Sequence, residues 1–273
     1  MLNNKNQFSL FFLTLVTIMS ACISIAEKPY IVAHRGASNE APENTRPAFK
    51  LAWEQGADAI EGDFYLTKDG RIVCIHDGNT KRVAGTNLVI AASTFAELRA
   101  LDVGRWKGER YRSTVIPSVE EVFALVPDSK GIYVEIKCGP EIIPEMLKIL
   151  TRSGLKDEQV TFICFKKEVI RELKRVAPHY RAFWLCSLKR DKAENITPTL
   201  EQALATLREI KADGFSSSLG NLSDGYVQGI IAAGFEWHVW TVDNPEAAKR
   251  CVRLGAKSIT TNVPGEMIRV LND

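Results

Sequence analysis

The segment Ile31-Val-Ala-His34-Arg35-Gly36 indicates the fold of this chain, and Pro42-Glu43-Asn44-Thr45 follows it after a short polar turn. An apolar run that ends in polar residues, a loop and a helix-start signal together indicate a β/α unit. In such units, ligands bind at the loop that follows the strand. His34 can move protons near neutral pH, and Arg35 can hold a phosphate or a carboxylate with two hydrogen bonds.

The same alternation of strand and helix continues to the end of the chain. Two strands at 57–66 and 71–75 form a hairpin, and further strands are predicted at 131–136, 160–164, 182–185, 214–215, 237–242 and 258–261. Helices are predicted at 46–55, 119–125, 141–153, 167–176, 200–210, 224–233, 245–254 and from 264 onward. With the hairpin counted as one unit, this gives eight β/α units in 273 residues, close to the roughly 250 residues of a typical barrel. The sequence therefore predicts an α/β fold, a closed (β/α)8 TIM barrel over residues 27–273.

One connection, at residues 81–117, is too long for an ordinary loop between a strand and a helix. It is rich in polar residues and glycine and carries a short predicted helix at 94–101. We interpret it as a small insertion after the second strand unit, beside the active face of the barrel.

The N-terminal residues 1–26 resemble a bacterial secretory signal peptide, and the apolar run at 8–19 is shorter than the ~20 residues of a membrane span. Cleavage after Ala26 would release a soluble protein. Cleavage before Cys22, in the lipobox-like Met19-Ser20-Ala21-Cys22, would leave a lipid anchor. An uncleaved N-terminal anchor is a third possibility. Each alternative predicts an exported domain, periplasmic or extracellular.

Composition excludes a general attraction to nucleic acid, because 35 basic and 33 acidic residues give a net charge of only +2. Anion binding must therefore come from a local cluster. The cysteines of the domain are scattered and lie mostly in apolar runs, which predicts small buried thiols rather than disulfides or a zinc site. They are Cys74, Cys138, Cys164, Cys186 and Cys251.

Charged residues gather at the carboxyl ends of the predicted strands, where a barrel brings them to one mouth. They are His34, Arg35, Glu61, Asp63, His76, Asp77, Glu135 and Lys137. Glu61 and Asp63 are two apart on one strand and therefore point the same way. Three carboxylates that include Glu135 would repel one another without a cation, and an all-oxygen set suits Mg²⁺ or Ca²⁺.

Two alternatives to this metal site remain open from the residues alone. Glu61 and Asp63 could lie on a solvated strand face. Glu135 and Lys137 could form a simple ion pair, or Lys137 could hold a phosphate as a point charge.

Two histidines beside a divalent metal and two cations are typical of a phosphoryl-transfer site. One imidazole takes a proton from the attacking oxygen and the other protonates the leaving alkoxide. The pattern does not say which of His34 and His76 is the base. Of the other two histidines, His179 is predicted at the surface and His238 in a structural role.

The motifs together are similar to those of the glycerophosphodiester phosphodiesterase family, of the PI-PLC-like barrel type, from about Tyr30 to the C-terminus. They are HRG at 34–36, PENT at 42–45, ExD at 61–63, LTKDG at 66–70, HD at 76–77, EIK at 135–137, WTVDN at 240–244 and TTNVPG at 260–265.

This resemblance implies a role for each site residue. The acid/base pair is His34 and His76, and the ligands of Mg²⁺ or Ca²⁺ are Glu61, Asp63 and Glu135. Arg35 and Lys137 bind the phosphate. Glu43 lies near the metal and His34, and Trp240 forms a wall of the substrate cleft. The implied substrate is a small glycerophosphodiester, hydrolysed to glycerol 3-phosphate and an alcohol such as choline or ethanolamine. The insertion would contact the glycerol end. Direct attack by water and a cyclic phosphate intermediate are both compatible with this site.

The chain departs from the family pattern at Cys164-Phe165, where Ser-Phe is frequent, and at Asn262, where Asp is frequent. Both positions lie on later strands, so we expect them to affect substrate fit more than chemistry. A lysophospholipase D-like activity would need an apolar groove, for which the candidates are Trp106, Tyr111, Phe165, Trp184 and Trp240. A non-catalytic phosphate-ester-binding protein would lack a catalytic residue, and none is missing. The sequence predicts no oligomeric state, and it predicts membrane contact only through a lipid anchor at Cys22.

Overall fold

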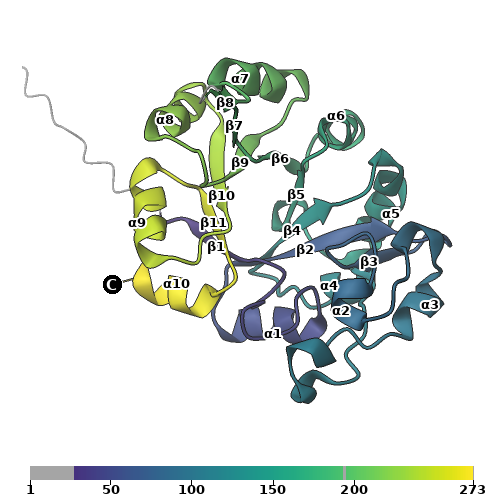
Figure 1. Cartoon of the computed structure of the whole chain (residues 1–273). Coiled ribbons are helices and arrows are strands. Elements are labelled where there is room, and N and C mark those ends of the chain that lie inside the picture. Colours follow the sequence, from purple (N-terminus) through teal and green to yellow (C-terminus); the bar gives the residue numbers. More distant parts are fainter. Residues whose placement is uncertain (1–27, 193–194, 273) are drawn as a thin grey trace, which may run out of the picture.

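Eight parallel strands close into a barrel in the computed structural model, which describes residues 28–192 and 195–272 (Figure 1). The barrel strands are β1 (Tyr30–Ala33), β2 (Ala59–Leu66), β4 (Gly131–Ile136), β5 (Val160–Cys164), β6 (Arg181–Cys186), β9 (Gly214–Ser218), β10 (Glu236–Trp240) and β11 (Ser258–Thr261). The barrel is closed because β1 pairs in parallel with both β11 and β2. The predicted (β/α)8 fold is confirmed. The predicted signal segment, with Cys22, lies outside the described residues.

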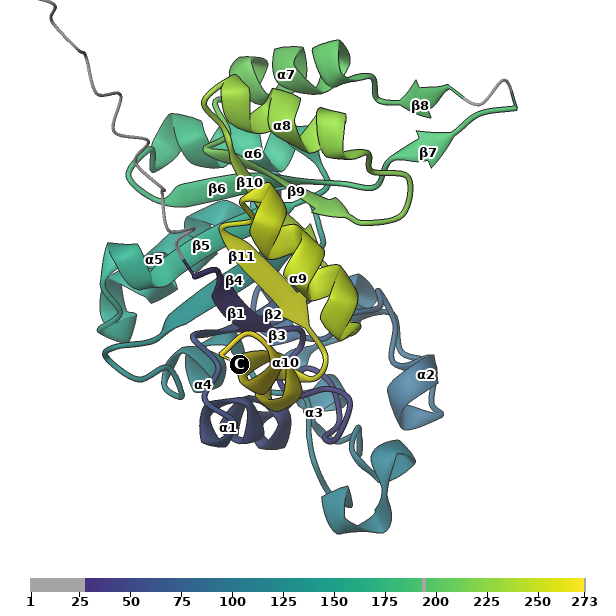
Figure 2. The same ribbon diagram turned by 90° about the vertical axis from the view of Figure 1, so that its left-hand side faces the viewer.

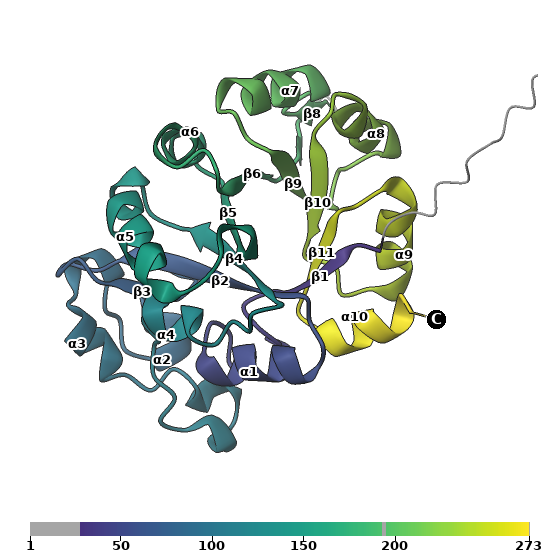
Figure 3. The ribbon, with the colours of Figure 1, turned by 180° about the vertical axis from the view of Figure 1, so that it is seen from behind.

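Helices form a ring outside the strands, which Figures 1 and 3 show from the two ends of the barrel. They are α1 (Arg46–Glu54), α4 (Val119–Phe123), α5 (Ile143–Ser153), α6 (Lys167–Val176), α7 (Leu200–Glu209), α8 (Asp224–Ala232), α9 (Pro245–Leu254) and α10 (Pro264–Val270), with 3-10 turns η4 (Pro140–Ile142) and η5 (Asp157–Gln159). Thr45 caps α1, since its side chain accepts a hydrogen bond from the Ala48 N–H. Among the described helices, none has the length and apolar character needed to cross a membrane.

The core has two main layers, as the alternation of side chains along a strand requires. The outer layer fills the space between strands and helices and includes Phe49, Phe64, Phe162 and Trp237. The inner layer plugs the barrel and consists of Val32, Ala59, Tyr133, Ile163, Phe183 and Leu185, with Trp240 packed against it. The five described cysteines are free thiols, four of them buried, as predicted.

The segment 81–117, called the insertion below, follows β3 (Ile72–Cys74), which pairs antiparallel with the outer half of β2. It contains α2 (Lys81–Ala84), η1 (Ile90–Ala92), α3 (Phe95–Arg99), η2 (Arg105–Lys107) and η3 (Glu109–Tyr111). Its own small core joins Val83, Ile90, Leu98, Val103 and Ile116 to Val73 and Ile75. This core holds the insertion firmly on the β2–β3 edge of the barrel.

The structure differs from the sequence expectations at three places. The strand β3 ends at Cys74, so His76 lies in the following loop. The strand β9 is longer than predicted, because Ser216 and Ser217 are buried polar residues that break the apolar pattern. The small hairpin of β7 (Lys189–Arg190) and β8 (Ile196–Thr197) was not predicted, since two-residue polar strands give no periodic signal. It projects on the same side of the barrel as α2 (Figure 2).

Candidate active site

The turn after β1 depends on a glycine. Gly36 has φ +81°, and a Cβ atom there would lie 2.5 Å from the carbonyl carbon of Ala48, so only glycine allows this close approach to α1. Arg35 is also left-handed, with φ +56°, and its backbone N–H donates to Glu61 Oε2 at 2.8 Å. The turn thereby fixes His34 and Arg35 at the carboxyl-end mouth.

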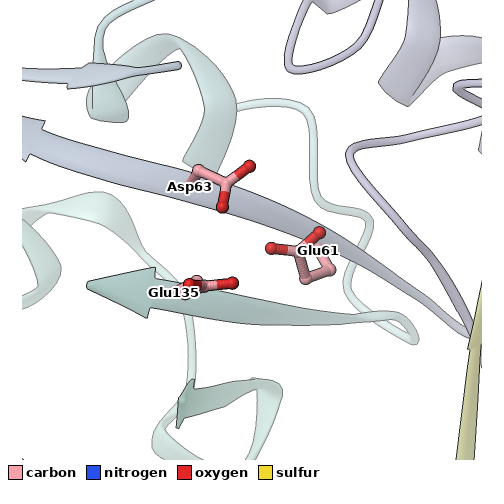
Figure 4. A group of neighbouring side chains, drawn as sticks. All are labelled: Glu61, Asp63 and Glu135. Carbon is pink, nitrogen blue, oxygen red and sulfur yellow. The ribbon is translucent and has the colours of Figure 1, made fainter. Parts of the chain in front are cut away.

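The three predicted metal ligands meet at this mouth (Figure 4). Glu61 and Asp63 both point inward from β2, and Glu135 on β4 is the register partner of Asp63. All three are buried, and one oxygen from each lies within 4.8 Å of the others. The open alternative of a solvated strand face for Glu61 and Asp63 is therefore wrong, because water does not reach them.

The three carboxylates of this triad are not fully neutralised by the basic side chains around them. Burial, then Asp63, raises the pKa of Glu135 to about 7, and burial with both neighbouring carboxylates raises the pKa of Glu61 well above its usual value. Burial would also raise the pKa of Asp63, but Lys137 and Arg35 hold it below its ordinary value. Buried carboxylates of this kind favour a cation between them.

The triad fits a hard divalent cation. Glu61 Oε1 and Asp63 Oδ1 are both buried and accept no hydrogen bond from the described residues, although Asp63 Oδ1 makes an ion pair with Lys137. Lys137 Nζ lies 2.6 Å from Glu135 Oε1 and 3.2 Å from Asp63 Oδ1 as an ion pair. Lys137 forms the ion pair with Glu135 and also lines the cavity. The structure is therefore compatible with both alternatives for Lys137, an ion pair with Glu135 and binding of a phosphate. An all-oxygen set of ligands, in which Glu61 Oε1 has no partner of its own, suits Mg²⁺ or Ca²⁺ rather than zinc.

His34 is oriented by an amide. Its Nδ1 lies 2.7 Å from Asn262 Oδ1, and Asn262 Nδ2 donates to Asp243 Oδ2 at 2.6 Å. Because Asp243 takes the amide N–H, the oxygen of Asn262 must face the ring, and Nδ1 of His34 must carry a proton. Burial, then the Arg35 charge, lowers the pKa of His34. Nε2 is therefore the nitrogen left with a lone pair.

His76 is oriented by a carboxylate instead. Its Nδ1 lies 2.7 Å from Asp77 Oδ1, and the other oxygen of Asp77 accepts from Arg82 Nε at 2.7 Å. Burial would raise the pKa of Asp77, but Arg82 and His76 hold it below its ordinary value. The two histidines thus have different partners on the same ring nitrogen.

Arg35 and Glu43 form an ion pair, with Arg35 Nη1 donating to Glu43 Oε1 at 3.0 Å. Glu43 also accepts two hydrogen bonds from Arg82, each 2.8 Å long. The expected role of Glu43, near the metal and His34, stays a prediction, and the charge of Glu43 acts on the pKa of His34. Its carboxylate is bound by both arginines, so it also positions charge around the site.

A cavity of about 120 Å³ has one polar side and one apolar wall. The charged and titratable residues on its polar side are His34, Arg35, Glu61, His76, Glu135 and Lys137. The wall consists of Ile163, Phe165, Leu185 and Trp240. Phe165 and Trp240 pack edge to face with ring centroids 5.4 Å apart, and Phe165 is 43% exposed. Trp240 therefore lies where the sequence predicted a cleft wall.

The other aromatic candidates for a groove are not part of this cavity. Trp184 packs edge to face on Phe215 behind the wall. Trp106 and Tyr111 lie on η2 and η3 of the insertion. Any apolar surface for a substrate is therefore smaller than the five aromatic residues suggested.

The sequence model of the glycerophosphoryl diester phosphodiesterase family matches residues 34–266, which include every residue of this site. The chain belongs to this family. A glycerophosphodiester phosphodiesterase of Caldanaerobacter subterraneus is 32% identical over 251 residues, covering 89% of this chain and 98% of the relative. A lysophospholipase D of Mus musculus is 26% identical over 270 residues, covering 89% of this chain and 86% of the relative.

A solved structure agrees with the family assignment. An Oleispira antarctica phosphodiesterase, in complex with the product sn-glycerol-3-phosphate, superposes with a TM-score of 0.80 at 25% identity, covering 90% of this chain and 97% of that one. These findings confirm the predicted family and the predicted class of enzyme, a phosphoric diester hydrolase.

Within the phosphodiesterase site, three contributing residues were missed by sequence reasoning. Asn44 donates to Asp63 Oδ2 at 2.6 Å and accepts from the Asp63 N–H at 3.1 Å, so it fixes that carboxylate. Its signal was its place within the PENT motif. Arg82 gave no signal, because the insertion has no regular pattern. Asn262 was noted only as a departure from the family pattern expected to affect substrate fit, and its contact with His34 was not foreseen.

The other two histidines play no part in this site. His238 is buried, stacks on Phe183 with centroids 3.8 Å apart, and binds Ser258 Oγ through Nδ1 at 2.8 Å. His179 is exposed beside Tyr180. The predicted structural and surface positions of these residues are confirmed.

Proposed function

We propose that this protein hydrolyses glycerophosphodiesters to glycerol 3-phosphate and an alcohol, with His34 as general base, His76 as general acid and a divalent cation at the acidic triad. The observation that carries the proposal is the placement of two differently partnered histidines around one cavity with the buried triad. The relatives named for this activity support the substrate class.

The base role of His34 follows from its surroundings. Its amide partner fixes Nδ1–H, and its pKa is lowered by burial and Arg35. Near neutral pH the ring is therefore uncharged, and Nε2 can accept the proton of an attacking oxygen. The proton balance is the same whether that oxygen belongs to water or to a substrate hydroxyl that closes a cyclic phosphate.

The acid role of His76 follows from Asp77. Its hydrogen bond with Nδ1 orients the ring, and a ring with a proton on both nitrogens is the form that acts as a general acid. Such a ring can give its Nε2 proton to the alkoxide as the phosphorus–oxygen bond breaks. An alkoxide is a poor leaving group, so this proton is needed for a diester.

The phosphate would lie against Arg35 and Lys137, which both line the cavity. Their charges neutralise phosphate oxygens, Arg35 through its planar fork and Lys137 as a point charge. Held by Glu61, Asp63 and Glu135, a Mg²⁺ or Ca²⁺ ion would supply further Lewis-acid stabilisation of the phosphate charge.

A second candidate function is a lysophospholipase D-like hydrolysis of lipids that keep one acyl chain. The apolar wall with the exposed Phe165 favours it, and one relative carries that name. The two functions differ in the need for an acyl chain, so one assay on matched substrates separates them.

The test is release of choline from glycerophosphocholine and from lysophosphatidylcholine by the purified protein. Both are assayed with EDTA and then with Mg²⁺ or Ca²⁺ restored. We expect turnover of glycerophosphocholine that disappears with EDTA and returns with metal. Turnover of the lysolipid alone would favour the second candidate. Binding of glycerophosphocholine without turnover under any metal would favour a non-catalytic phosphate-ester-binding protein.

We also propose that the domain is exported, from the signal-like residues 1–26. The mass of the N-terminal peptide, measured from soluble and membrane fractions of producing cells, tests this. A peptide that begins at Glu27 supports release, a lipidated Cys22 supports anchoring, and an intact Met1 in the cytoplasmic fraction contradicts export.

A further inference from the structure

The insertion reaches the active site through the side chain of Arg82, on α2. Its Nε donates to Asp77 Oδ2 at 2.7 Å. Its two terminal nitrogens donate to the two oxygens of Glu43, each at 2.8 Å. One guanidinium therefore holds two carboxylates that come from separate parts of the chain.

Each of these carboxylates also holds a residue of the proposed mechanism. The second oxygen of Asp77 binds His76 Nδ1 at 2.7 Å, and Glu43 Oε1 binds Arg35 Nη1 at 3.0 Å. A continuous chain of charge-assisted hydrogen bonds thus runs from His76 through Asp77, Arg82 and Glu43 to Arg35. Such bonds are short and directional, and bidentate arginine pairs fix geometry as well as charge.

The position of Arg82 is itself well fixed. Its neighbour Val83 is buried in the hydrophobic core of the insertion, which continues to Val73 on β3 and to Ile75 directly after that strand. Arg82 is 44% exposed at its side chain, so its ion pairs add little to stability by themselves. The ion pairs of Arg82 instead fix geometry. Its guanidinium group can bind Asp77 and Glu43 together only when the two carboxylates keep their present separation.

We propose that Arg82 is a positioning residue for the reaction, which sets His76 relative to Arg35 and makes the insertion a working part of the active site. This inference rests on the proposed function for its kinetic consequences. A lysine could not replace Arg82, since an ammonium group lacks the planar fork that serves three oxygens at once.

The kinetic test compares Arg82→Ala, Arg82→Lys and Arg82→Gln with a matched control, Arg112→Ala. Arg112 lies in the same insertion, is 60% exposed and pairs only with Glu109 among the ion pairs described. With saturating divalent cation, we expect the Arg82 variants to lose about 10- to 100-fold in kcat on glycerophosphocholine, the range for an ångström-scale misplacement. Arg112→Ala should keep the wild-type rate. Added guanidinium should restore part of the rate of Arg82→Ala and leave the rate of Arg112→Ala unchanged.

A second readout does not depend on the substrate. The imidazole N–H proton of His76, held on Asp77, should give a downfield NMR signal in the wild type and in Arg112→Ala. We expect this signal to broaden or disappear in the folded Arg82 variants. If the wild type hydrolyses no tested diester, the proposed function fails, and this signal still tests the positioning role.

Two results would overturn the inference. One is an Arg82→Ala variant that keeps the wild-type kcat and the His76 signal. The other is a variant that loses activity while the His76 signal stays and guanidinium restores nothing, which would indicate a structural role only. Should Arg82→Ala fail to fold, Arg82→Gln, which keeps the aliphatic part of the side chain and removes the charge and the guanidinium fork, gives the same comparison.

Discussion

Asn262 Oδ1 lies 2.7 Å from His34 Nδ1, although 228 positions separate the two residues. The amide is held from its other side by Asp243, so this contact decides which imidazole nitrogen carries the proton. It leaves Nε2 of His34 with the lone pair that the proposed general base needs. A residue directly after the last strand therefore sets the tautomer of a histidine directly after the first strand.

We expect Asn262→Asp to move the acidic limb of the pH–rate profile to higher pH. A general base works only when unprotonated, so activity falls as the pH drops through the pKa of His34. Burial and Arg35 now hold that pKa below its usual value, and a carboxylate on Nδ1 would raise it. The profile should be measured as kcat/KM at saturating divalent cation, which keeps the acidic triad ionised.

Asn39→Asp is the matched control, because Asn39 is exposed in the loop after β1. The substitution adds the same negative charge without a contact to the imidazole of His34. An equal shift in both variants would mean that the general field of the mouth, rather than the Asn262 contact, sets the pKa.

We expect His34→Ala and His76→Ala each to lower kcat by about 10²–10⁴-fold, the usual contribution of a general acid or base. Neither ring is among the large buried core residues, so the fold should survive, as circular dichroism and thermal melting can check. For a substrate with a highly acidic alcohol, such as a nitrophenyl ester, His76→Ala should lose much less, because that leaving group needs no proton. A loss of the same size on both substrates would remove the acid role from His76.

The sequence was sufficient to predict which site residues lie close together where their proximity depends only on the barrel topology. Glu61, Asp63 and Glu135 stand at the carboxyl ends of parallel strands, and a closed barrel must bring such positions to one mouth. The Asn262 contact was out of reach, because it depends on side-chain directions across the β1–β11 pair. Arg82 was out of reach as well, since no periodic pattern fixes the path of the insertion, and only its hydrophobic core places α2 against the site.

We expect Asn44→Ala to weaken divalent-cation binding about 10- to 100-fold, the usual cost of removing a residue that orients a ligand. Asn44 holds Asp63 through two hydrogen bonds, and without them the carboxylate can rotate toward Lys137. The affinity can be measured by calorimetric titration of metal-free protein with Mg²⁺ or Ca²⁺. Unchanged affinity in a folded variant would show that Asp63 needs no such support.

We expect Glu135 to contribute a loss of stability to the metal-free protein as the pH rises from about 5 to 8. The pKa of Glu135 is raised to about 7 by burial and Asp63, so the folded state binds a proton that the unfolded state has already released. A carboxyl group of this kind stabilises the fold at low pH, and that stability is lost as the pH rises through the folded pKa. The loss is on the order of 2–3 kcal/mol, from the size of the shift.

The comparison with Glu135→Gln isolates this effect. His34 and His238 have pKa values lowered mainly by burial, so they contribute stability in the opposite direction as the pH rises through the same range. Both histidines remain in Glu135→Gln, and the difference between the two proteins therefore reports the carboxyl group. Urea unfolding at pH 5 and pH 8 should show the wild type losing more stability than the variant. Saturating divalent cation should restore the wild type at pH 8, because it binds the ionised triad. Equal pH dependence in both proteins, or no stabilisation by any divalent cation, would contradict a cation site built from these three carboxylates.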